Sequence, residues 1–100
     1  MFKVLISDSM STVAQEIFKK QNIETEIKTG LSEKEIINII SEYEALIVRS
    51  ATKVTKNIII AGKKLKVIGR AGAGVDNIDV VNAKEKNILV MNTPGGNTNA

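Results

Sequence analysis

The stretch that decides the fold is residues 45–79, ALIVRSATKVTKNIIIAGKKLKVIGRAGAGVDNID. It begins with an apolar, β-branched run at 45–48, continues into an isoleucine-rich segment, and reaches a second apolar run at 66–69. A strand, a helix and a second strand in this order favour two parallel strands joined by a crossover helix. The stretch therefore predicts one βαβ unit.

Similar short apolar runs lie on both sides of this unit. Together with 45–48 and 66–69, the predicted strands are Lys3–Ser7, Ile23–Lys28 and Ile88–Met91. Several are continuously apolar, which is typical of strands covered on both faces. The order of elements predicts an α/β fold: a flavodoxin-like, doubly wound parallel sheet of about five strands in the order 2-1-3-4-5, with helices on both faces and right-handed crossovers.

Four helices are predicted between these strands. Ser9 or Ser11 caps the first, whose apolar residues are Val13, Ala14, Ile17 and Phe18. Ser32 and Glu35 fit a capping box for the second, whose apolar face is Ile36, Ile37, Ile39, Ile40 and Tyr43.

The last two helices are shorter. Thr55 caps a helix that carries Ile58, Ile59 and Ile60 and ends at Gly62. Asp76 or Asp79 caps the fourth, with Val80, Val81 and Ala83 facing inward and Asn87 as a left-handed stop. Since these helices are rich in β-branched residues, packing against the sheet is expected to hold them.

Composition excludes several chemistries. The 100 residues contain no cysteine and no histidine, so a disulfide framework and an imidazole base are excluded, and no metal site is predicted. The apolar start is too short for a signal peptide and no run approaches membrane-spanning length, so a cytoplasmic location is expected. Residues 45–75 hold seven bases and no acid, which indicates either a solvated helix face or an anionic partner.

Functional residues are expected where parallel strands end, because ligands of open α/β sheets bind beyond the carboxyl ends of the strands. Arg49 directly follows the run 45–48, where its guanidinium can bind an anion in a bidentate manner. The alternative is a structural contact, either a salt bridge to Asp8, which follows the first strand, or a hydrogen bond to a C-terminal carbonyl. Asp8 itself is interpreted as a structural, hydrogen-bonding residue rather than a catalytic acid.

The loop 69–76, GRAGAGVD, is the best anion cradle in the chain, because its glycines let backbone N–H groups approach an anion closely. The alternative is a loop that only makes a tight turn. It is a poor dinucleotide fingerprint, since Asn77 stands where a third glycine belongs and no acidic residue follows the next strand. A receiver-like phosphoacceptor domain is also excluded, because Arg49 occupies the position of its aspartate.

Three ordered motifs, LIVRSATKVT (46–55), VIGRAGAGVDNID (67–79) and ILVMNTP (88–94), are taken together with the opening KVLISD (3–8). They resemble the D-isomer-specific 2-hydroxyacid dehydrogenase family, and within it the branch that oxidises 3-phospho-D-glycerate to 3-phosphohydroxypyruvate in serine biosynthesis. The resemblance implies that residues 1–91 form the first part of a substrate-binding domain. Residues 92–100 are then a hinge segment toward a missing Rossmann domain that binds NAD.

The resemblance also assigns roles to residues. It implies substrate binding by seven residues: Arg49, Ser50, Arg70, Gly72, Ala73, Gly74 and Asn97. Ala73 is also implied to lie near the nicotinamide of NAD. The catalytic arginine, glutamate and histidine of the family would follow Ala100, so this chain is expected to be inactive alone. Its expected partners are a small anionic substrate and other subunits of a homo-oligomer, with no nucleic acid and no membrane.

A second hypothesis comes from a different class of protein. The chain could instead be a freestanding α/β module that binds a small anion for regulation. A module is expected to finish on a packed strand or helix, whereas residues 92–100 form a turn-rich segment. This difference favours the fragment of an oxidoreductase.

Overall fold

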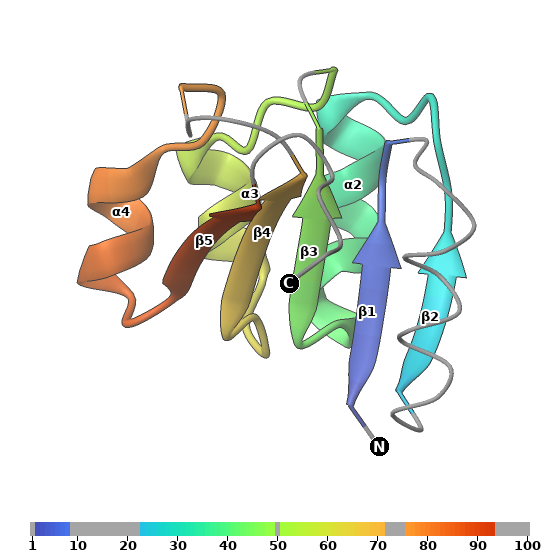
Figure 1. Ribbon diagram of the computed structural model, residues 1–100, viewed down its shortest axis with the longest axis horizontal. Helices are drawn as coiled ribbons and strands as arrows, with labels where there is room; N and C mark the ends of the chain where they lie inside the picture. Colours follow the sequence, from blue (N-terminus) through green and yellow to red (C-terminus); the bar gives the residue numbers. More distant parts are fainter. Residues whose placement is uncertain (1, 9–22, 50, 72–75, 94–100) are drawn as a thin grey trace.

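The computed structural model describes residues 2–8, 23–49, 51–71 and 76–93. These residues form a five-stranded sheet in which every neighbouring pair of strands is parallel. The strands are β1 (Lys3–Ile6), β2 (Glu24–Ile27), β3 (Ala45–Val48), β4 (Val67–Ala71) and β5 (Leu89–Thr93). Their order is β2-β1-β3-β4-β5, which confirms the predicted flavodoxin-like topology (Figure 1).

The described helices are α2 (Glu33–Ile39), the 3₁₀ turn η1 (Ile40–Glu42), α3 (Lys56–Ala61) and α4 (Val80–Glu85). The capping box is present, because the Ser32 hydroxyl accepts from the Glu35 amide and the Glu35 carboxylate accepts from the Ser32 amide. Thr55 caps α3, and Asp79 rather than Asp76 caps α4. The predicted first helix, with Val13, Ala14, Ile17 and Phe18, lies outside the described residues.

The larger core lies on one face of the sheet. The strand register aligns Leu5, Leu46, Ile68 and Val90 in one row across four strands. Helices α2 and α3 lie behind the sheet in Figure 1. Ile36 of α2, Ile40 of η1, and Ile58 and Ile59 of α3 belong to the same core as this row and are almost inaccessible to solvent. Burial of this size supplies the packing that β-branched helices need.

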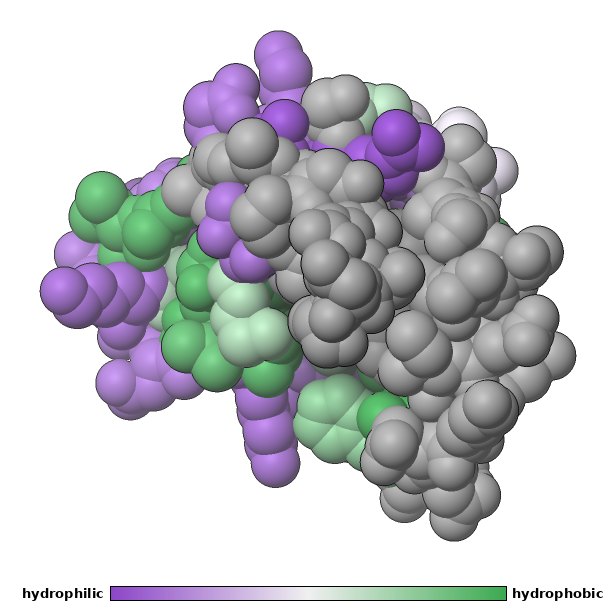
Figure 2. Space-filling view, viewed as in Figure 1, coloured by the Kyte–Doolittle hydropathy of each residue, from purple (hydrophilic) through white to green (hydrophobic). Residues whose placement is uncertain are grey.

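The opposite face carries two further rows, which are Val4–Ala45–Val67–Leu89 and Ile6–Ile47–Gly69–Met91. The β1 end of these rows is buried, whereas Leu89 is 57% exposed and Met91 is 46% exposed on β5. Figure 2 shows apolar side chains gathered at this end of the molecule, over β5 and α4.

The structure corrects three sequence expectations. Val80 and Val81 do not face inward: they are 36% and 68% exposed, and Ala83 alone of the predicted trio is buried. Strand β4 continues through Arg70 to Ala71, so Arg70 lies within the strand rather than after it. Strand β5 continues to Thr93, two residues beyond the predicted end at Met91.

Both strand extensions have one cause. The ladder between β4 and β5 continues past the apolar runs, pairing Arg70 with Asn92 and Ala71 with Thr93. Backbone pairing does not depend on side-chain polarity, so an apolar run underestimates the length of a strand. The predicted left-handed stop after α4 is confirmed, because Asn87 has φ 61°.

Candidate functional site

The carboxyl ends of β1 and β3 are joined through Asp8, as expected for a structural residue. Its carboxylate oxygen Oδ2 accepts hydrogen bonds from the Arg49 amide at 2.7 Å and from the Thr52 amide at 3.0 Å. The other oxygen, Oδ1, accepts from the Thr52 hydroxyl at 2.6 Å. Asp8 is only 7% exposed, so these bonds compensate for the loss of its hydration.

The hydroxyl of Thr52 also receives a hydrogen bond. The Ser7 hydroxyl donates to it at 3.1 Å, and all three of Ser7, Asp8 and Thr52 are buried. The result is a short relay from Ser7 to Thr52 to Asp8 between two adjacent strand ends. Buried polar groups that satisfy one another in this way fix a unique arrangement.

A second side chain, Asn77, reaches the same loop from the segment after β4. Its Nδ2 group donates to the carbonyl of Arg49 at 2.6 Å and to the carbonyl of Thr52 at 2.5 Å. Backbone hydrogen bonds join the same two segments. The Val54 amide donates to the Asn77 carbonyl at 2.8 Å, and the Asp79 amide donates to the Val54 carbonyl at 2.9 Å. The loop after β3 is thus held on one side by Asp8 and on the other by Asn77.

Arg70 has a different environment from Arg49. It pairs with Val48 in the ladder, and its guanidinium Nη1 forms an ion pair with the exposed carboxylate of Asp76. The hydrogen bond from Arg70 lowers the pKa of Asp76 below its ordinary value of 3.8. Among the described residues, none accepts a hydrogen bond from the buried Nε of Arg70. Part of the Arg70 guanidinium is therefore already used by a neighbouring acid.

The structure thus describes two of the predicted site residues. Arg49 is exposed at the end of β3, and Arg70 is mostly buried within β4. Ser50, Gly72, Ala73, Gly74 and Asn97 lie outside the described residues. The predicted alternative partner of Arg49, Asp8, contacts its backbone amide.

Two residues of this network were not predicted from the sequence as part of the site. These residues are Thr52 and Asn77, whose hydrogen bonds within the network join residues that are 25 to 45 positions apart in the sequence. The sequence offered one signal for Asn77, which was its place directly after the glycine-rich loop. A polar side chain at that position of a parallel sheet lies at the same edge as the loop after β3.

The amino ends of the strands carry an ionisable cluster at the opposite edge. Lys3 lies within 3.9 Å of Glu24, Glu26 and Glu42. The Tyr43 hydroxyl donates to Glu26, and this hydrogen bond, more than the nearby lysines, lowers the pKa of Glu26 below its ordinary value of 4.5. Burial, followed by the Glu26 carboxylate, raises the pKa of Tyr43 well above its ordinary value.

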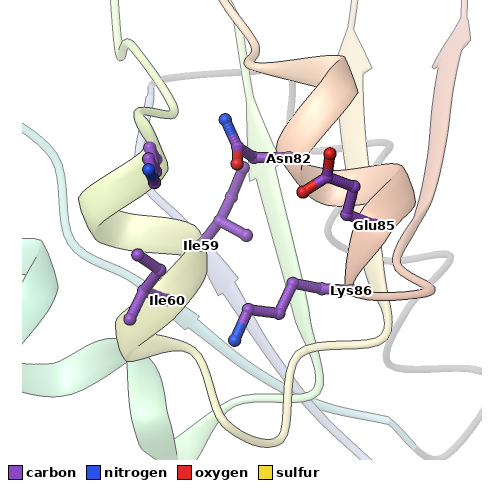
Figure 3. A pocket seen from close by; sticks show the side chains of 6 residues that line it. Ile59, Ile60, Asn82, Glu85 and Lys86 are labelled. Atoms are coloured by element: carbon purple, nitrogen blue, oxygen red, sulfur yellow. The ribbon is translucent and has the colours of Figure 1, made fainter.

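An open hollow of about 340 Å³ lies between α3 and α4. Ile59 and Ile60 of α3 line it together with Asn82, Glu85 and Lys86 on the α4 side, and Figure 3 shows Ile59 pointing toward Asn82. None of the predicted site residues lines it, so it is not part of the candidate site. Over the described ranges, no group of three or more acidic, histidine or cysteine side chains could hold a metal ion, and no helix there is long and apolar enough to cross a membrane.

Known proteins share this architecture and sequence. The family model described as "D-isomer specific 2-hydroxyacid dehydrogenase, catalytic domain" matches residues 4–100. The D-3-phosphoglycerate dehydrogenase of Synechocystis is 58% identical over 98 residues, and that of Homo sapiens is 51% identical over 96 residues. The NAD+-bound 3-phosphoglycerate dehydrogenase of Entamoeba histolytica superposes with a TM-score of 0.84 at 35% identity.

These relatives are much longer than the chain. The match covers 98% of the chain but 18% of the Synechocystis protein, and 96% of the chain but 18% of the human protein. In the Entamoeba histolytica structure it covers 94% of the chain and 33% of the solved chain. The chain therefore spans less than a fifth of the curated relatives it matches.

Proposed function

The chain belongs to the D-isomer specific 2-hydroxyacid dehydrogenase family, and on that premise we propose that it forms the first part of the substrate-binding domain of an NAD-dependent dehydrogenase. The proposed reaction oxidises the CH–OH group of 3-phospho-D-glycerate to the ketone of 3-phosphohydroxypyruvate. Relatives named D-3-phosphoglycerate dehydrogenase, at 58% and 51% identity, support this choice of substrate.

The observation that carries the proposal is the position of Arg49. It stands exposed at the carboxyl end of a central strand, and the loop that holds it is tied to β1 and to the segment after β4. A substrate with a phosphate and a carboxylate needs two anion-binding groups. We assign the phosphate to the Arg49 guanidinium and the carboxylate to the backbone amides of Gly72, Ala73 and Gly74.

The described residues do not fit a dinucleotide site. Asn77 takes the place of the third glycine of a dinucleotide fingerprint, and its Nδ2 group is occupied by the carbonyls of Arg49 and Thr52. We therefore propose that NAD is held by another part of the parent enzyme, with Ala73 only near its nicotinamide. The catalytic histidine, glutamate and arginine are proposed to lie there too, together with the contacts of a homo-oligomer, so that this chain is inactive alone.

The experiment is an NMR titration of the chain with 3-phosphoglycerate and, separately, with NAD. We expect 3-phosphoglycerate to shift the amides of Arg49, Ser50 and Gly72–Gly74, and NAD to cause little change. A well-dispersed spectrum with no shift would remove the claim of a preformed substrate half-site. Tight binding of NAD would overturn the assignment of the chain to a substrate-binding domain.

A further inference from the structure

Both peptide groups of Arg49 are fixed by side chains from other segments. Its amide N–H donates to Asp8, which follows β1, at 2.7 Å, and its carbonyl accepts from Asn77, which follows β4, at 2.6 Å. Asp8 and Asn77 are 41 and 28 residues away from Arg49 along the chain. The two peptide planes set the direction of the Cα–Cβ bond, so these contacts decide where the Arg49 side chain leaves the backbone.

The same two side chains hold the loop a second time, at Thr52. Asp8 accepts from the amide and the hydroxyl of Thr52, and Asn77 donates to its carbonyl. Both ends of the segment from Arg49 to Thr52 are therefore bound by Asp8 and Asn77 together. Ordering a loop residue costs roughly 1–2 kcal/mol of conformational free energy, and a loop that is already ordered avoids this cost when a ligand binds.

We propose that Asp8 and Asn77 are positioning residues that fix the direction of Arg49 for the anionic substrate. This inference rests on the proposed function, since it concerns the same anion site. Neither side chain needs to touch the substrate. Asn77 also directly follows the glycine-rich loop at 69–76, so it connects the two segments assigned to the phosphate and to the carboxylate.

Electrostatics distinguishes this role from a direct effect of charge. Asp8 places a negative charge close to Arg49, so removing that charge would by itself strengthen the binding of an anion. Positioning predicts the opposite result for Asp8→Asn. The amide oxygen of asparagine can still accept from one or two N–H groups, but its Nδ2 group cannot accept the Thr52 hydroxyl proton.

The test uses four variants of the chain. Asn77→Ala and Asp8→Ala remove the proposed contacts, and Asp8→Asn keeps an oxygen for the N–H groups but loses the acceptor for the Thr52 hydroxyl. Asn57→Ala is the matched control, because Asn57 is exposed on α3. The first readout is amide hydrogen exchange without ligand, compared between the loop amides of Arg49 and Thr52 and the core amide of Ile68. The second readout is the Kd for 3-phosphoglycerate, taken from NMR shifts.

We expect Asn77→Ala to speed exchange of the two loop amides on the order of tenfold while the Ile68 amide stays protected, and to weaken the Kd on the order of tenfold. Asp8→Asn should weaken the Kd less than Asp8→Ala, and Asn57→Ala should leave both readouts unchanged.

Several results would overturn the positioning role. One is an unchanged exchange rate of the loop amides in Asn77→Ala, and another is a lower Kd for 3-phosphoglycerate in Asp8→Asn. A Kd that stays unchanged although the loop amides exchange faster would also contradict it. So would a loss of protection at Ile68 equal to that at the loop amides. If the wild-type chain binds no 3-phosphoglycerate, the proposed function loses its half-site. In that case the exchange comparison alone decides whether Asp8 and Asn77 hold Arg49.

Discussion

Asp8 accepts two hydrogen bonds from Thr52, one from its amide at 3.0 Å and one from its hydroxyl at 2.6 Å, although 44 residues separate them. The pair joins the end of β1 to the loop after β3, and both residues are buried. The Asp8 oxygen that accepts from the Thr52 amide also accepts from the Arg49 amide, so this contact lies directly beside the residue assigned to the substrate phosphate.

Replacing Thr52 with valine tests the strength of this contact. Thr52→Val keeps the shape of the side chain but removes the donor to Asp8 and the acceptor for Ser7, so we expect a loss of about 1–3 kcal/mol in the free energy of unfolding. Thr25→Val on the edge strand β2 is the control and should change stability by less than about 0.5 kcal/mol. Urea denaturation measures both, and equal effects would contradict the importance of the buried relay.

Arg49→Ala tests the assignment of the phosphate. In an enzyme that contains this chain with its cofactor domain, we expect the KM for 3-phosphoglycerate to rise strongly and that for an unphosphorylated 2-hydroxy acid to rise much less. Loss of a charge-assisted bidentate contact corresponds to about 2–4 kcal/mol. Steady-state kinetics measures KM for both substrates. Lys53→Ala, which removes another exposed basic side chain near Arg49, is the control. Equal rises for both substrates would move Arg49 to a carboxylate-binding or structural role.

The sequence predicted those features that depend on local patterns. Ser32 and Thr55 cap the starts of helices through their own side chains, and Asn87 ends a helix through its own positive φ. The apolar runs at 45–48 and 66–69 locate two adjacent strands. The strand order follows from the alternation of elements together with the rules for parallel sheets.

Other features depend on contacts between distant segments. The pairing of Arg70 with Asn92 extends two strands, and no local pattern contains this information. The same holds for Asn77, whose partners lie 25 and 28 residues earlier. The prediction that Val80 and Val81 face inward was wrong, because α4 buries only a narrow stripe of its surface. Helical spacing alone did not select the correct face of the helix.

Helix α4 gives a direct test of this correction. Val81 is 68% exposed, so Val81→Lys should change the free energy of unfolding by no more than about 0.5 kcal/mol. Ala83 is fully buried two positions later, so Ala83→Leu should destabilise the fold by about 1–3 kcal/mol through overpacking. Thermal unfolding of the two variants checks both values. A large loss in Val81→Lys together with a neutral Ala83→Leu would reverse the assigned face.

The hydrogen bond from Tyr43 to Glu26 predicts a dependence of stability on pH. Because the folded state lowers the pKa of Glu26, the stabilisation is fully present above the ordinary value of 4.5 and disappears as the pH falls through the lowered value. Tyr43→Phe removes the main cause of the shift, so it should cost about 1 kcal/mol near neutral pH, and this difference should shrink in acid. Urea denaturation of both proteins between pH 7 and about pH 3 measures the trend, and a constant difference would contradict it.

Gly69 and Ile47 face each other across β3 and β4, and their contact predicts a coupling between two substitutions. A Cβ atom on residue 69 would lie 2.9 Å from the Cδ1 atom of Ile47, which is closer than two carbon atoms pack. In the wild-type background this crowding offsets the gain of about 0.5–1 kcal/mol expected when alanine replaces a glycine within a strand, so Gly69→Ala should be neutral or destabilising.

Ile47→Val removes the Cδ1 atom and opens the space. In that background Gly69→Ala should recover the full gain of about 0.5–1 kcal/mol, even though Ile47→Val alone costs about 0.5–1.5 kcal/mol. A double-mutant cycle from urea denaturation isolates this coupling, because the Cβ atom added at residue 69 would be in direct contact with the Ile47 side chain. Additive effects of the two substitutions would mean that the Ile47 side chain turns away freely, and the close approach of β3 and β4 would then not be the reason for a glycine at position 69.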